Sequence, residues 1–253
     1  MNKTIRIAGA VVILSLSACA VHPGTSVAEA RRRAASFDFY YQQGLTFLEQ
    51  GEFGKAAAQF RAATEVKPDS AKAQNYLGLC YFRQKNYRPA RDHFEKAVAL
   101  DPKFASAYNN LAGTYSLELQ FEQAKAMFKK ALGLAPNMIS ANYSLGMLML
   151  NLGEREEGSR YLSRGIALDP DYLEKHKETV ASFSATEVDL AETFFACAAL
   201  YAAAGNAERT ADYLHKAEQA GFRAWDRILK EKEFDKVRDD PRVKEFLKQD
   251  SIR

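Results

Sequence analysis

Residues 71–104 read AKAQNYLGLCYFRQKNYRPARDHFEKAVALDPKF, and this stretch decides the fold. Small and large apolar side chains recur in it at helical spacing, followed by a proline: Leu77, Gly78, Tyr81, Ala90, Phe94, Ala97 and Pro102. Small residues let two helix backbones approach closely, while large ones fill the space between neighbouring helices. Proline cannot continue a helix, because it lacks a backbone N–H and clashes with the preceding turn. The stretch therefore predicts two packed helices that end before the proline.

The same unit recurs along the chain. Prolines 34 residues apart close four units in register: Pro68, Pro102, Pro136 and Pro170. The units are four consecutive blocks: 37–70, 71–104, 105–138 and 139–172. One helix pair cannot bury its apolar face alone, so the stability of such an array comes from contacts between neighbouring units.

This spacing resembles the tetratricopeptide repeat, a helix–turn–helix unit of 34 residues. The resemblance implies an all-α solenoid, a right-handed superhelix of antiparallel helix pairs. No stretch shows the alternating pattern of strands, which agrees with that class. Residues 191–224 resemble a degenerate fifth repeat, in which Thr210 replaces an alanine and Phe222 replaces the proline. Residues 225–253 combine one apolar stripe with a charged opposite face, which predicts C-terminal capping helices.

The N-terminus has the features of an export signal. Lys3 and Arg6 precede an apolar run that is too short to span a bilayer, and residues 16–19 read Leu-Ser-Ala-Cys. This ending resembles the lipobox of bacterial lipoproteins, which implies cleavage before Cys19 and acylation of Cys19. An ordinary signal peptide or a buried N-terminal helix is the alternative. Ala20 replaces the aspartate that retains enterobacterial lipoproteins at the inner membrane, which favours the periplasmic face of the outer membrane.

These features divide the chain into six parts. Residues 173–190 break the 34-residue register and are expected to form an insertion, either a helix or a loop. In order, the parts are a signal peptide (1–18), a lipidated tether with a lead-in helix (19–36), four repeats (37–172), the insertion (173–190), the degenerate repeat (191–224) and the capping helices (225–253). Arg31, Arg32 and Arg33 in the lead-in are interpreted as a solvated face, with contact to acidic lipid headgroups as the alternative.

Charge and motifs exclude several functions. Removing residues 1–18 takes Lys3 and Arg6 from 35 basic residues, so 33 remain against 32 acidic ones, and a nearly neutral chain argues against nucleic-acid binding. Cys80 and Cys197 lie three repeats apart and are expected to be free thiols, because solenoid repeats contact only their neighbours. A disulfide between them, formed if the insertion folds back, is the alternative. No metal-binding, nucleotide-binding or nucleophile motif is present. We predict no enzymatic activity, no metal and no cofactor beyond the lipid on Cys19.

The concave groove is the candidate partner-binding site. In the tetratricopeptide family the first helix of each pair lines this groove, and the resemblance places apolar side chains and amides there. The candidates are Tyr41, Asn75, Leu79, Phe82, Asn109, Asn110, Tyr143 and Met147. Amides can pair with the N–H and C=O groups of a bound peptide, while apolar pockets take its side chains. Ordinary packing is the alternative for Leu79, Phe82 and Met147, and a turn-stabilising role is the alternative for Asn110.

The resulting hypothesis is an exported, lipid-anchored scaffold that binds a peptide or helix of an envelope protein. Its lipobox, length and consecutive repeats resemble the lipoprotein pilots that help pilus and secretion secretins reach the outer membrane. An adaptor for cell-wall hydrolases or for polysaccharide export is the alternative. A small-molecule carrier or an enzyme that uses residues 173–190 or the C-terminal tail is a remote alternative.

Overall fold

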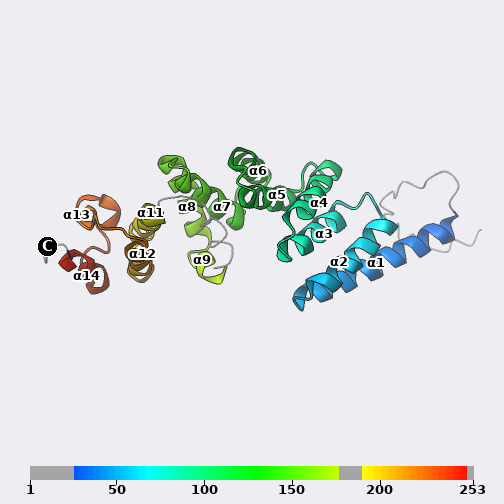
Figure 1. Ribbon diagram of the computed structural model, residues 1–253, viewed down its shortest axis with the longest axis horizontal. Helices are drawn as coiled ribbons and strands as arrows, with labels where there is room; N and C mark the ends of the chain where they lie inside the picture. The colour runs from blue at the N-terminus through cyan, green and yellow to red at the C-terminus, as the bar shows by residue number, and fades with distance from the viewer. Residues whose placement is uncertain (1–25, 177–189, 250–253) are drawn as a thin grey trace, which may run out of the picture.

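The computed structural model describes residues 26–176 and 190–249, and all the regular secondary structure in these ranges is helical. The helices follow one another in a single elongated row, with α1 at one end and α14 at the other (Figure 1). The predicted all-α solenoid is therefore confirmed. The signal peptide, Cys19 and residues 177–189 of the insertion lie outside the described residues.

Four helix pairs form the main array. They are α1 (Val27–Glu49) with α2 (Phe53–Val66), α3 (Ala71–Arg83) with α4 (Tyr87–Leu100), α5 (Ala105–Leu117) with α6 (Phe121–Leu134), and α7 (Ile139–Asn151) with α8 (Arg155–Leu168). Helices α3, α5 and α7 start 34 residues apart, at the first residue of their units. At the start of α3, the side chain of Ser70 accepts a hydrogen bond from the backbone N–H of Ala73, which satisfies a helix-end donor.

The turn inside each pair needs one residue in the left-handed region. Glycine supplies it in the first pair, at Gly51 (φ 74°), and in the fourth pair, at Gly153 (φ 80°). Gly205 (φ 77°) does the same in a fifth pair, which is described below. Lys85 (φ 62°) and Leu119 (φ 60°) take the same conformation in the second and third pairs. Side chains disfavour this region, so these two turns carry backbone strain that glycine would avoid.

Helices within a pair approach closely at glycines of the repeat pattern. A Cβ atom on Gly78 would lie 2.9 Å from the ring of Phe94 in the facing helix. In the fourth pair the approach is backbone to backbone, since a Cβ on Gly146 would lie 2.7 Å from the backbone nitrogen of Leu162. The small residues of the repeat pattern are therefore required by helix contact.

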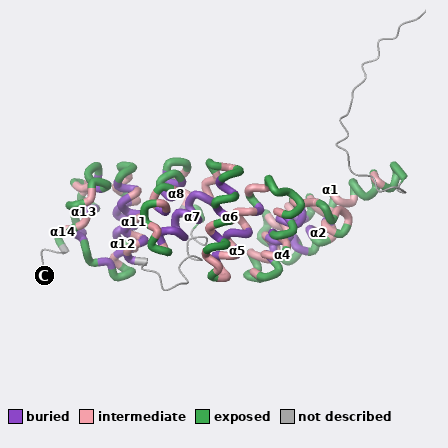
Figure 2. The backbone as a smooth tube through the Cα atoms, turned by 90° about the horizontal axis from the view of Figure 1, so that it is seen from above, coloured by how far each residue is buried: buried purple, intermediate pink, exposed green. Residues whose placement is uncertain are grey.

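A fifth pair and a cap complete the row. α9 (Tyr172–Lys175) follows α8, and α11 (Leu190–Ala203) pairs with α12 (Ala207–Gln219). The cap consists of α13 (Arg227–Lys230), the short 3₁₀ helix η2 (Lys232–Phe234) and α14 (Pro241–Gln249). Trp225 is fully buried in it, with its ring 5.0 Å from that of Phe222 and 5.1 Å from that of Phe246. Buried residues run along the whole row, and exposed ones cover its outside (Figure 2).

Candidate partner-binding surface

The first helices of the repeats differ in how far they are open to solvent. On α1 and α3, the candidates Tyr41, Leu79 and Phe82 are only partly buried. The ring of Tyr41 packs against Phe60 at 5.7 Å and Tyr76 at 5.8 Å, and burial raises the pKa of Tyr41 to about 12. Its phenol therefore stays neutral, as a potential hydrogen-bond donor at a partly open apolar surface.

An amide pair links α3 to α5. Asn110 donates from Nδ2 to Oδ1 of Asn75 at 3.0 Å and keeps partial exposure. The prediction that Asn75 is open in the groove is wrong, because it is buried, with 5% exposure, beneath this contact. The neighbouring Asn109 is also partly exposed, but its Oδ1 is shielded from water and has no hydrogen-bond partner among the described residues. An unpaired buried acceptor costs about 1–3 kcal/mol, so Asn109 is the polar group of this surface with most to gain from a donor.

The structure corrects the placement of Tyr143 and Met147, which were expected on the open groove. Both belong to the core, with Tyr143 only 1% exposed and Met147 4% exposed. The reason is α11, which packs against α7 and brings Cys197 Sγ to 3.6 Å from Met147 Sδ. The repeat pattern contains no signal for this contact, because the insertion separates α11 from the register of the first four units.

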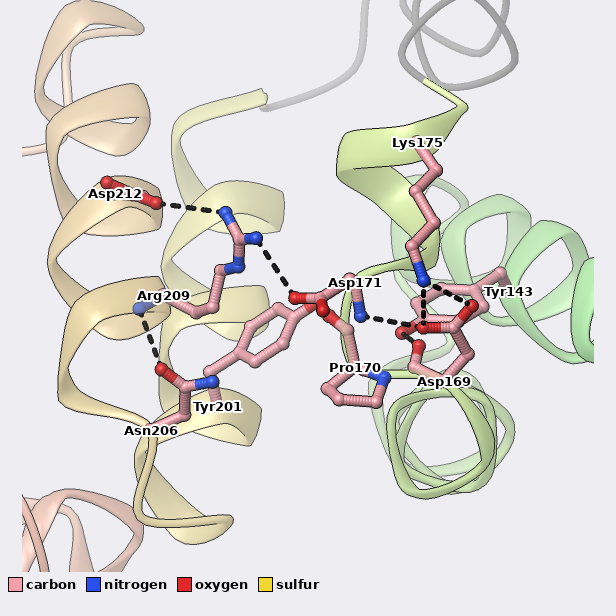
Figure 3. A network of polar contacts seen from close by, with 9 residues as sticks. All are labelled: Tyr143, Asp169, Pro170, Asp171, Lys175, Tyr201, Asn206, Arg209 and Asp212. Atoms are coloured by element: carbon pink, nitrogen blue, oxygen red, sulfur yellow. Dashed lines mark hydrogen bonds and ion pairs between the residues drawn. The ribbon is translucent and has the colours of Figure 1, made fainter.

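Two tyrosines form hydrogen bonds to the backbone just after α8, where it faces α11 (Figure 3). The hydroxyl of Tyr143 donates to the carbonyl oxygen of Asp169 at 2.7 Å, and that of Tyr201 donates to the carbonyl oxygen of Pro170 at 2.9 Å. Tyr143 also stacks on Tyr172 of α9, with ring centroids 5.0 Å apart. Burial raises the pKa of Tyr201 to about 12 and that of Tyr143 well above its usual value, so both phenols remain neutral donors.

Ion pairs reinforce the same junction. The guanidinium of Arg209, on α12, lies 3.0 Å from Asp171 Oδ1 and 3.3 Å from Asp212 Oδ2 (Figure 3). Lys175 Nζ lies 3.2 Å from Asp169 Oδ1, six residues earlier in the chain. These contacts attach α12 to the segment that leads into the insertion. The fourth and fifth pairs are thus packed together, and the open part of the surface is confined to α1, α3 and α5.

The remaining reactive side chains are held in structural contacts. Cys80 and Cys197 are buried free thiols, and burial raises the pKa of each to about 12, which suppresses the nucleophilic thiolate. His93 stacks on Tyr81 at 5.5 Å and lies 2.8 Å, Nδ1 to Oε1, from Gln74; burial lowers its pKa. Residues 26–176 and 190–249 contain no group of His, Cys, Asp and Glu suited to a metal ion. In the same ranges, no helix combines the length and apolar character needed to cross a membrane.

Known proteins share this architecture. Tetratricopeptide-repeat models match residues 41–105, 93–126 and 118–181. A structure of Pseudomonas aeruginosa PilF is similar, with 20% identity, a TM-score of 0.52, and coverage of 86% of this chain and 99% of that one. A crystal structure of MamA protein is similar with 18% identity, a TM-score of 0.52, and coverage of 79% of this chain and 97% of that one. Identities this low show a shared fold, and no curated protein matches the chain.

Proposed function

Because this chain is a tetratricopeptide-repeat protein, we propose that it is a scaffold that binds a peptide or helix of another protein on α1, α3 and α5. The observation that carries the proposal is the contrast between this open surface and α7. Tyr41 on α1, Leu79 and Phe82 on α3, and the amides of Asn109 and Asn110 on α5 keep partial exposure, whereas α7 is buried from Ala141 to Leu150. Partly exposed apolar side chains on the same series of helices as partly exposed amides suit an extended chain, which offers both side chains and backbone hydrogen-bonding groups.

The same proposal includes an anchor and a location. The motif Leu-Ser-Ala-Cys at residues 16–19 supports acylation of Cys19, and Ala20 supports the periplasmic face of the outer membrane. The partner is then an envelope protein. Assistance to a secretin of a pilus or secretion system is the specific version that we favour, and an adaptor for cell-wall enzymes or polysaccharide export is the alternative.

The test is photo-crosslinking in living cells. A benzophenone amino acid replaces Phe82 in the open surface, and the matched control replaces Arg88, an exposed residue of α4. Capture of an envelope protein from position 82 but not from 88 supports the proposal, and the identity of that protein separates a secretin from a cell-wall enzyme. Crosslinks from position 82 that stay within the chain would show that this surface binds no partner.

The anchor is tested separately. The Cys19→Ser variant should leave the membrane fraction, while a Cys80→Ser variant should remain with it. A Cys19→Ser chain that still carries lipid and sediments with membranes would contradict the acylation.

A further inference from the structure

The first helix is longer than its repeat requires. α1 begins at Val27, ten residues before the first unit starts at residue 37, and Figure 1 shows it reaching past the end of α2. In this extension every residue from Val27 to Ala35 except Ala30 is exposed. The extension is therefore a free helical rod between the tether and the repeat array.

One face of α1, which runs from this rod into the start of the first repeat, carries positive charge and an exposed aromatic ring. At about 100° per residue, Ala28, Arg32, Ala35 and Phe39 follow one another on a single face, with Arg31 at its edge. Phe39 is 60% exposed, the largest exposed fraction of any aromatic side chain in the described part of the chain.

The three arginines of the rod differ in their surroundings. Arg33 points to another side of the helix, where its guanidinium lies 3.3 Å from Glu29. Within the described residues, Arg31 and Arg32 have no such ion pair, and both are exposed. Their charge is therefore available to an external anion.

We propose that the face formed by Arg31, Arg32 and Phe39 rests on an anionic phospholipid surface. Basic side chains are attracted to acidic headgroups, and an aromatic ring is favoured at the level where headgroups meet acyl chains. This inference rests on the proposed acylation of Cys19. Seven residues lie between Cys19 and Val27, and the eight steps from one Cα atom to the next span at most about 28 Å, so an acylated Cys19 holds the rod near the membrane.

Docking of this face sets the direction of the solenoid relative to the membrane. α1 continues from the rod into the first repeat without a break, so a docked rod fixes the orientation of α1 and of the open surface beside it. A single lipid-anchored point would leave that orientation free. Two contacts, one covalent and one electrostatic, are the combination that gives stable and oriented membrane binding.

The test measures how deep position 39 lies in a membrane. The full acylated chain with Phe39→Cys is labelled with a nitroxide and bound to vesicles of phosphatidylcholine, with or without phosphatidylglycerol. Cys80 and Cys197 are buried and escape labelling. A label at Leu229→Cys, 55% exposed near the opposite end of the row, is the control. The readout is the collision rate of each label with a water-soluble nickel complex, and flotation of the vesicles reports the anchor.

On anionic vesicles, the label at 39 should be protected from collision and the label at 229 should not. The ratio of docked to free chain should fall about fivefold for Arg31→Gln or for Arg32→Gln, and about 25-fold for both. Arg33→Gln is the matched control and should change the ratio less, because Glu29 compensates its charge. High salt should remove the protection, because the distance over which exposed charges attract each other falls from about 8 Å at physiological ionic strength to about 3 Å at 1 M salt.

Other results would overturn the inference in distinguishable ways. A chain that floats with anionic vesicles while its label at 39 collides as freely as that at 229 refutes the docked face alone. Equal protection on uncharged vesicles refutes the role of the arginines. Protection that appears only after an envelope extract is added assigns the face to a protein instead. A chain that does not float refutes the anchor, and the inference falls with it.

Discussion

Adding one methyl group at Gly146 tests the packing that holds the fourth repeat together. The Cβ atom of an alanine would lie 2.7 Å from the backbone nitrogen of Leu162 and 3.0 Å from the carbonyl oxygen of Gly158. These are backbone atoms, so no side chain can rotate away, and α7 and α8 must separate. Overpacking of this kind costs about 1–3 kcal/mol. Two close backbone contacts place this variant in the upper part of that range, at about 2–3 kcal/mol. Alanine regains at most about 1 kcal/mol of helix propensity, so Gly146→Ala should lower the free energy of unfolding by about 1–2 kcal/mol.

Gly133→Ala is the control for this prediction, because a Cβ at Gly133 of α6 meets nothing within 4 Å. The same chemical change should there raise the free energy of unfolding by up to about 1 kcal/mol. Urea denaturation measures both variants, and hydrogen exchange localises the effect, since repeat arrays do not always unfold in one step. Amides of α7 and α8 should exchange faster in Gly146→Ala. The close backbone contact would be refuted if Gly146→Ala were as stable as the parent, or more stable, while Gly133→Ala showed its expected gain.

Four further predictions concern single side chains. Leu119→Gly should raise the thermal midpoint, because glycine removes left-handed strain of about 1 kcal/mol at a side chain that is 57% exposed. Burial lowers the pKa of His93 in the folded chain, so as the pH falls the unfolded chain binds a proton on this histidine before the folded chain does. The urea midpoint should therefore fall as the pH drops through and below about 6.5, and His93→Gln should lose that part of the fall. Cys80 and Cys197, whose pKa burial raises to about 12, should react with a chromogenic thiol reagent only in denaturant. Asn109→Leu should keep or raise the melting temperature, because it removes an unpaired acceptor, yet reduce crosslinking to a partner.

The repeat register carries most of what the sequence predicts about the fold. Gly78 stands at a position where each of the four units has a small residue, and Phe94 at one where each has a large apolar residue. The structure brings the two into contact across the helix pair. That contact is local, within one unit, so a single period is enough to predict it. The all-α solenoid follows from the period for the same reason, since neighbouring units can bury their apolar faces only by stacking.

The closed end of the groove is what sequence reasoning missed. Tyr143 and Met147 sit at positions that face the groove in the family, but α11 returns after the insertion and covers them. The contact of Met147 with Cys197 joins residues 50 apart, across a segment outside the repeat period. Tyr201 stands at a large-residue position of the degenerate repeat, equivalent to Tyr81, but the repeat does not predict that its hydroxyl donates to Pro170. Arg209 occupies a position where the repeat specifies no residue type. The 34-residue period cannot predict the contacts between α7 and α11, because they depend on the path of the non-repeating segment between the two helices.

The difference between the two ends of the row has a mechanical consequence. At the far end, Tyr143 and Tyr201 hold the end of α8 through partly buried hydrogen bonds, and Arg209 adds an ion pair to the same junction. Polar contacts whose groups are satisfied rigidify the helices they join. The open surface lies on the first three helix pairs, and α1 leads back to Cys19 through seven residues. A partner bound there would lie on the side of the row nearer to an acylated Cys19, with the fourth and fifth repeats on the far side. A scaffold built this way would therefore hold its partner near the membrane.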